Sequence, residues 1–291
     1  MPPPRAAVRL WMTMGPLSLV ACGGGAALMH PAHTLPQNRV SAGAGVSGQF
    51  VFGQGQRAID TGKASGAPGA ISGGANEQQF LAGAAANAVF APGVSPWVGA
   101  RVGLGQNFEA GLAYTGRTAR IDARHAFGND SFALSIGAGA SAVIFHPTTS
   151  ADSATPQLSS GRFQGTTGGF AAGGFGFDVP VIVGWRSTAS VVQVWGGARA
   201  GFERVAGDVP VNADSSAALE STITAHRWWG GGLVGAAVGF EPFWIALELD
   251  VAYQSLSASA SFPPASGVPG QRGAEVTGVS LSPTGALIGK F

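Results

Sequence analysis

Apolar and polar residues alternate along much of the chain after about residue 40. The clearest run places large apolar side chains at every second position: Phe243, Ile245, Leu247, Leu249, Val251 and Tyr253. Similar runs cover residues 108–115 and 132–144. Successive side chains of a strand point to opposite faces, so this period of two predicts strands with one apolar face and one small or polar face.

Residues that favour turns divide these runs into about ten strands. We expect strands at 40–54, 78–105, 107–116, 118–127, 131–146, 162–186, 189–203, 220–240, 243–257 and 275–291. Short turns near Gln106-Asn107, Gly128-Asn129-Asp130, Ser187-Thr188 and Glu241-Pro242 alternate with longer loops at 55–77, 147–161, 204–219 and 258–274. Two strands are overlong and contain prolines, so twelve strands is the alternative.

Composition changes what these strands are expected to form. Charged residues make up 11 % of the chain, where a soluble domain has about 25 %, and glycine reaches 47 of 291 residues. After the N-terminus, no apolar stretch approaches the ~20 residues that a membrane helix needs. Alternating lipid-facing and lumen-facing residues reconcile both facts. The sequence therefore predicts an all-β, antiparallel up-and-down transmembrane barrel, with short turns on the periplasmic side and both ends of the barrel there.

Aromatic residues gather near the expected strand ends, where membrane barrels carry girdles. One group lies close to the short turns: Phe108, Phe127, Phe132, Trp185, Phe240, Phe243 and Trp244. A second lies near the opposite ends: Tyr114, Phe145, Phe163, Phe202 and Tyr253. A soluble β-sandwich would bury its aromatics centrally instead.

Most charges inside the expected strands fall on the face that points inward: Arg101, Glu109, Arg120, Asp122, Arg124, Arg199, Glu203, Glu248 and Asp250. A basic side chain facing lipid at mid-bilayer would cost about 2–4 kcal/mol, so this placement agrees with the alternation. The hairpin at Gln106-Asn107 favours an ion pair between Arg101 and Glu109. Because about ten strands enclose a narrow interior, we expect these charges to fill the lumen, and an open small-solute channel is the alternative.

The N-terminus has the layout of a signal peptide at residues 1–21, with Arg5 and Arg9 before an apolar stretch. The run Leu19-Val20-Ala21-Cys22 resembles the lipobox of bacterial lipoproteins. The resemblance implies that Cys22, the only cysteine, becomes the lipidated first residue of the mature protein. Residues 22–38 show no apolar period and are expected to form a flexible lipidated tether carrying His30 and His33, with the barrel occupying 39–291.

The chain ends in Phe291, which resembles the C-terminal strand signal of Gram-negative outer-membrane barrels. Gly289 stands where that family usually carries an apolar residue, so the match is partial. The resemblance implies outer-membrane lipid as the surroundings, and the barrel-assembly machinery and lipoprotein-processing enzymes as partners during biogenesis. The sequence indicates nothing about oligomeric state.

Other classes of function find little support. The net charge of +1 provides no basic footprint for nucleic acid, and the sequence predicts no cofactor and no metal site. An outer-membrane hydrolase would need a histidine with a carboxylate, but His125 lies on the face opposite to Asp122, and His146 and His226 have only Asp152 and Asp214 in loops. We expect a non-enzymatic barrel of structural or surface-contact role. The alternatives are a porin-like channel and a lipid-tethered soluble β-sandwich or adhesin.

Overall fold

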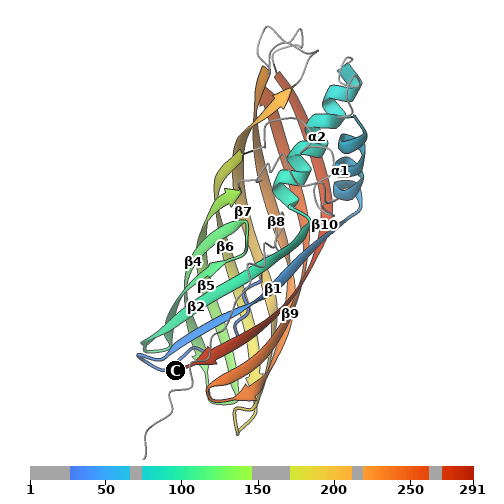
Figure 1. The fold of residues 1–291 in the computed structure, drawn as a ribbon. Helices are drawn as coiled ribbons and strands as arrows, with labels where there is room; N and C mark the ends of the chain where they lie inside the picture. Colours follow the sequence, from blue (N-terminus) through green and yellow to red (C-terminus); the bar gives the residue numbers. More distant parts are fainter. Residues whose placement is uncertain (1–26, 66–73, 146–170, 212–218, 262–270) are drawn as a thin grey trace, which may run out of the picture.

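The computed structural model describes residues 27–65, 74–145, 171–211, 219–261 and 271–291. In them, ten antiparallel strands form one closed barrel (Figure 1). The strands are β1 (Val40–Phe52), β2 (Gly93–Gly105), β3 (Phe108–Tyr114), β4 (Thr118–Gly128), β5 (Phe132–Phe145), β6 (Ala171–Arg186), β7 (Val192–Val211), β8 (Leu219–Phe240), β9 (Phe243–Ser261) and β10 (Gln271–Lys290).

Each strand pairs with its neighbours in sequence, and β1 closes the sheet on β10, with Ser41 opposite Lys290 and Phe52 opposite Val279. The predicted antiparallel up-and-down barrel of about ten strands is therefore confirmed. One closed sheet also rules out the two-sheet sandwich and the twelve-strand alternative. The long segment containing Pro180 is a single strand, β6, whose ladder with β5 is interrupted between Ile136 and Gly139.

The four predicted short turns all lie at one end of the barrel, which we call the turn end. They connect β2 to β3, β4 to β5, β6 to β7 and β8 to β9. The first residue of β1 also lies there, because Val40 exchanges backbone hydrogen bonds with Phe291. Both ends of the barrel are thus at the turn end.

The loop expected at 55–77 and the first part of the strand expected at 78–105 are wrong. The structure has two helices there, α1 (Gln54–Ser65) and α2 (Gly74–Phe90), before β2 begins. Alanines at 82, 84–86 and 88 favour helix. A Cβ at Gly83 would lie 2.6 Å from the Cα of Gly62, so glycine lets the helices pack closely. Neither helix is long and apolar enough to cross a membrane.

The strands extend beyond the expected boundaries on one side of the barrel. Parts of the loops predicted at 204–219 and 258–274 belong instead to β7, β8, β9 and β10. Figure 1 shows these strands rising beside α1 and α2 at the end opposite the turns, which we call the helix end. The inward residues of this extension pack with the helices in one apolar cluster that includes Ile59, Leu81, Phe90, Val205, Ile223, Leu256 and Val276. Burial against the helices is what extends the strands.

Strand β9 exchanges its apolar and polar faces part-way along. From the turn end to Gln254, its outward residues are large and apolar and its inward residues include Glu248 and Gln254. Beyond Gln254 the outward positions are all serine and the inward ones are apolar: outward Ser255, Ser257, Ser259 and Ser261, inward Leu256, Ala258 and Ala260. Between the turn end and this level, the apolar face of the strand points outward. Between this level and the helix end, the apolar face points inward and is buried.

The two strands beside β9 exchange their apolar and polar faces near the same level. Tyr253 lies opposite Gly230 of β8 and Val279 of β10, and on β8 the exchange comes slightly closer to the helix end, because Trp228 still faces outward and Arg227 inward. From there to the helix end, the inward residues are apolar, namely Ile223, Ala225, Ala274 and Val276, and polar residues such as Thr222, His226 and Glu275 face outward. Toward the turn end, Val234, Val238, Val279 and Leu287 face outward. The boundary is therefore shared by three adjacent strands of the barrel wall and is not peculiar to β9.

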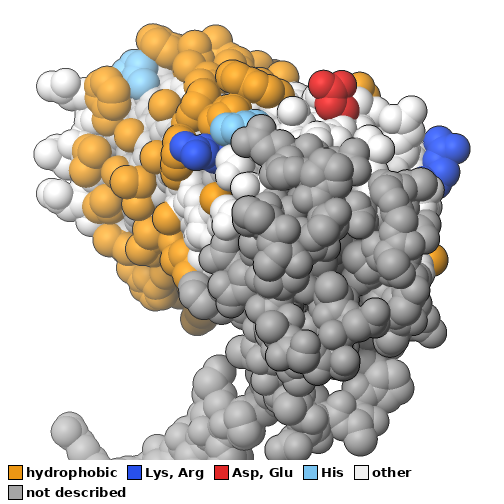
Figure 2. All heavy atoms as spheres, turned by 90° about the horizontal axis from the view of Figure 1, so that it is seen from above, with side chains coloured by type: hydrophobic (Ala, Val, Ile, Leu, Met, Phe, Trp, Pro, Cys, Tyr) orange, Lys and Arg blue, Asp and Glu red, His pale blue; other side chains and the backbone are white. Residues whose placement is uncertain are grey.

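The apolar outer surface forms a band bounded by aromatics. At a rise of ~3.4 Å per residue and a tilt of ~40°, the ten residue-to-residue steps from Phe243 to Tyr253 span ~26 Å along the barrel axis, close to the ~25 Å band of membrane barrels. Outward aromatics at the turn end are Phe108, Phe127, Phe132, Trp185, Phe240 and Phe243. Trp244, expected among them, points inward and is buried. Figure 2, from the helix end, shows hydrophobic side chains over much of the visible flank and few charged ones.

The N-terminal segment, residues 27–39, runs from inside the barrel, where residues 27–30 are buried, to the rim at the turn end, where residues 36–38 are exposed, so the flexible tether expected at 22–38 is wrong for its described part. His30, expected in solvent, is 2 % exposed. A Cβ at Gly103 of β2 would lie 2.0 Å from the carbonyl oxygen of Pro36, so glycine permits this close approach. Residues 1–21, Cys22, His146, Asp152, Phe163 and Asp214 lie outside the described residues.

Candidate functional site

Three layers fill the lumen between the two ends. The N-terminal segment occupies the turn end, a network of charged side chains occupies the middle, and the α1–α2 pair packs against the wall at the helix end. All nine charged residues predicted to face inward do so: Arg101, Glu109, Arg120, Asp122, Arg124, Arg199, Glu203, Glu248 and Asp250. The middle layer is built from them together with residues that the sequence reading missed.

The main network is a chain of alternating charges. Asp178 accepts hydrogen bonds from Arg120 (Nε and Nη2, each 2.9 Å) and from Arg199 (Nε, 2.9 Å). On the other side of Arg120, the carboxylate of Asp122 pairs with it and with Arg101. The expected pair between Arg101 and Glu109 across the hairpin is present, and Glu109 also binds Arg124 at 2.9 Å. Seven charged groups are thus joined from Arg124 to Arg199.

A second cluster lies nearer the helix end. Glu203 accepts hydrogen bonds from Arg117 and from Arg227 at 2.7 Å. Arg227 also donates to the amide oxygen of Gln254 at 2.9 Å. All four side chains are buried. Each carboxylate of these two clusters binds at least two guanidinium groups, as buried ion pairs require.

The sequence reading missed Asp178, Arg117 and Arg227. The first could have been found, because it alternates with Phe177 and Val179, which face outward. Arg227 likewise precedes the outward Trp228. Arg117 has no strand period to place it, since it lies in the connection between β3 and β4.

Wall side chains hold the N-terminal segment through its backbone. Glu248 accepts hydrogen bonds from the backbone amides of Leu28 (2.6 Å) and Met29 (3.1 Å), and also from Trp195 Nε1 (2.9 Å). The backbone amide of Leu35 donates to Glu109 at 2.8 Å. These bonds replace the strand pairing that the segment lacks.

Within the middle layer, the remaining space is small. Two cavities among the charged side chains have volumes of about 50 and 30 Å³. Each has room for a few water molecules and no more. The described part of the lumen therefore offers no passage to a solute in this conformation.

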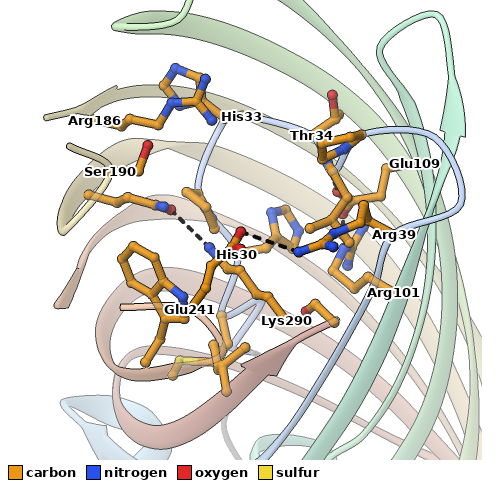
Figure 3. Close-up of a pocket in the computed structure, with 18 of the residues that line it drawn as sticks. His30, His33, Thr34, Arg39, Arg101, Glu109, Arg186, Ser190, Glu241 and Lys290 are labelled. Atoms are coloured by element: carbon orange, nitrogen blue, oxygen red, sulfur yellow. Dashed lines mark hydrogen bonds and ion pairs between the residues drawn. The ribbon is translucent and has the colours of Figure 1, made fainter. Parts of the chain in front are cut away.

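A larger cavity of about 640 Å³ opens at the turn end (Figure 3). The N-terminal segment forms one side with His30 and His33, and Arg186 and Lys290 reach it from β6 and β10. The ammonium of Lys290 lies 4.1 Å from the centroid of the Trp244 ring. Burial, and secondarily the nearby Arg186 guanidinium, lower the pKa of His33.

No catalytic arrangement is visible in the described part of the chain. His125 packs on the outer surface between the rings of Phe108 and Phe127, each with its centroid 4.4 Å away. His226 is exposed and stacks on Phe202. Within the described ranges, no group of three or more His, Cys, Asp or Glu side chains is placed to hold a metal ion.

No family model and no curated protein matches the sequence. Solved structures similar to this one include the RagAB peptide transporter (TM-score 0.29, 11 % identity, 88 % of this chain and 41 % of that chain). Others are the CymD monoaromatic hydrocarbon channel (0.25, 10 %, 88 % and 89 %) and a Pseudomonas aeruginosa FadL homologue (0.19, 10 %, 87 % and 89 %). The chain spans about two fifths of the RagAB chain that it matches. TM-scores this low carry no argument about function.

Proposed function

We propose that this protein is an integral barrel of the Gram-negative outer membrane, with a lumen closed by its own chain and a structural or surface-contact role. The observation that carries the proposal is the change at Tyr253 from an apolar outer face to a serine outer face. In water, the exposed band of Ile245, Leu247 and Leu249 would be unfavourable, whereas a bilayer favours it. The serine-faced extension beyond it is suited to the aqueous phase outside the cell.

The filled lumen supports a role that does not depend on conduction. Each carboxylate of the two charged clusters binds two guanidinium groups, and the cavities between them have room only for water molecules. What extends from the membrane at the helix end is a serine-faced wall backed by the α1–α2 pair. Such a surface is suited to contact with other molecules, which is the role we propose.

Two measurements on the full chain test this proposal. Folded membrane barrels resist detergent, so we expect the membrane-extracted protein to migrate differently in electrophoresis before and after boiling. In planar bilayers we expect no discrete conductance steps. A protein that leaves the membrane without detergent would refute the membrane assignment, and regular conductance steps would refute the closed lumen.

A porin-like channel is the second candidate, and one observation favours it. Asn38 and Arg39 exchange backbone hydrogen bonds with Gly103 of β2, but residues 27–37 fill the turn end without belonging to the sheet, so they can leave the lumen with no strand pair broken. Replacing Glu248 by Ala removes the acceptor for the amides of Leu28 and Met29. Conductance steps in E248A and silence in the unaltered protein would support a channel plugged by its own N-terminal segment.

We further propose export by the signal peptide at 1–21 and lipidation at Cys22, supported by the lipobox-like run that ends there. Mass spectrometry of the mature N-terminus, with C22A as the unlipidated control, tests both. An unmodified N-terminus elsewhere would refute lipidation. The same proposal assigns Phe291 to recognition by the barrel-assembly machinery, which predicts slower assembly of a variant lacking this residue.

The proposed anchor sets a distance. Cys22 and Ala27 are five residue-to-residue steps apart, which span at most ~17 Å. The neighbouring Leu28 bonds to Glu248, which lies five residues along β9 from Phe243, or ~13 Å from the turn end along the axis. The anchored Cys22 therefore reaches the membrane beyond the rim only when the intervening residues are nearly extended. Lipid anchoring at Cys22 and the position of the N-terminal segment in the lumen therefore limit each other.

A further inference from the structure

The cavity at the turn end has the size and shape of a small-molecule site. Its volume of about 640 Å³ falls within the roughly 300–1,000 Å³ of typical ligand pockets. Its lining comes from the N-terminal segment, from the turn-end parts of the strands around the barrel, and from the turns that follow β6 and β8. Figure 3 shows side chains from these elements surrounding one space, with Arg186 and His33 on one side and Arg39 and Arg101 on the other.

The charged lining of this cavity is predominantly basic. Five basic side chains line it, and only two acidic ones do: Arg39, Arg101, Arg124, Arg186 and Lys290 against Glu109 and Glu241. Glu109 is already bound by Arg101 and Arg124, so it is not free to balance the others. Glu241 is largely exposed and lies 3.3 Å from Arg39. Asp122 and Asp130, outside the lining, pair with Arg101 and Arg186, so among the described residues Lys290 is the basic group of the cavity that has no carboxylate partner.

The uncompensated groups in the lining are hydrogen-bond donors. The ammonium of Lys290 has only Gln193 Oε1, at 3.5 Å, as an acceptor among the described residues. His30 Nδ1 lies 2.8 Å from Arg124 Nη1, which can only donate, so Nδ1 accepts and His30 Nε2 carries the hydrogen. His30 Nε2 and Trp244 Nε1 are buried and have no hydrogen-bond partner in the described structure.

A buried donor without an acceptor is costly, and an unpaired positive charge attracts an anion. From this geometry we propose that the turn-end cavity binds a small organic anion bearing carboxylate or phosphate groups. Lys290 and Arg186 hold the negative charges, and the indole N–H of Trp244 and the imidazole N–H of His30 donate to its oxygens. This is a binding activity beyond the closed barrel, exposed to the periplasm in the orientation proposed above.

The experiment uses the full chain, folded in detergent, with citrate and pyrophosphate as probes. Binding is measured by titration calorimetry at constant ionic strength, with choline chloride and glucose as ligands expected not to bind. Losing one charged hydrogen-bond donor is worth about tenfold or more in affinity. We expect K290Q and R186Q each to weaken binding by at least that factor, and K290R to restore part of it. The exposed Arg57 on α1 provides the control R57Q, expected to bind like the unaltered protein.

The outcomes separate this proposal from the proposed function. Each variant is first checked for heat-dependent migration, so that a failure to fold is not read as a loss of binding. Absence of binding by a well-folded, unaltered protein would overturn the anion site and leave the closed barrel standing. Equal binding by K290Q, R186Q and R57Q would also overturn it. Binding of short-chain phosphatidylglycerol, with neither citrate nor pyrophosphate bound, would support the anion site and assign the anion to a lipid headgroup.

Discussion

Replacing Asp178 by Asn tests whether the lumen network is a dry, paired structure. The substitution keeps the size of the side chain and removes the charge that Arg120 and Arg199 share through three hydrogen bonds of 2.9 Å. All three residues are buried. Removing one partner from a buried ion pair costs about 3–5 kcal/mol, because the remaining charge stays desolvated. We expect a loss of this size in the free energy of unfolding.

The measurement is urea unfolding of the barrel in phospholipid vesicles, followed by tryptophan fluorescence. D130N is the matched control, because Asp130 pairs with Arg186 at 3.3 Å on the surface, where its side chain is fully exposed. This control is expected to unfold like the unaltered protein. Adding R120M to D178N removes one stranded charge and should recover part of the loss. If D178N and D130N unfold alike, water reaches the network and the lumen is not closed.

Three further predictions concern the wall and the N-terminal segment. L247R places a charge on the apolar band and should cost about 2–4 kcal/mol of folding in vesicles, whereas S257R, beyond the band, should fold normally; equal folding would refute the membrane boundary. E248A should speed hydrogen exchange at the Leu28 amide, and unchanged exchange would show that Glu248 does not hold the segment. Because the pKa of His33 is lowered inside the barrel, protonation of His33 favours release of the N-terminal segment. The protection of the segment's amides from hydrogen exchange should therefore be constant above pH ~6.5 and decrease below it, and H33Q should reduce this pH dependence.

The exchange of apolar and polar faces divides the barrel wall into two parts, which favour opposite residue types on their outer and inner faces. Within the band, lipid selects apolar residues outside, and the narrow interior accepts paired charges. Beyond the band, water covers the outside, and the inward positions pack against α1 and α2. Residues 255–261 obey the same alternation as residues 243–253 with the faces exchanged. A sequence prediction based only on apolar residues facing outward ends this strand at residue 257 and assigns residues 258–261 to a loop, although they belong to β9.

The sequence by itself determined the parts of this protein that depend on local alternation. Strand identity, the short turns, the strand count and the inward direction of the charges follow from a period of two, because each neighbour in sequence fixes the face of the next residue. Even the pair between Arg101 and Glu109 follows, since a short hairpin sets their register. Residues 78–90 of α2 were predicted to be strand because their alanines and glycine also fit a narrow barrel wall, whereas α1 was assigned to a loop.

Only the tertiary structure decided what fills the barrel. Asp178 meets Arg120, 58 residues away in sequence, because the barrel's closure and register bring β4 and β6 to the same level of the lumen. The N-terminal segment has no apolar period from which its position could be predicted. Its backbone amides are bound by side chains of the barrel wall, such as Glu248, which is 220 residues from Leu28 in sequence. Such partners are set by the curvature of the whole sheet, and no window of sequence contains that information.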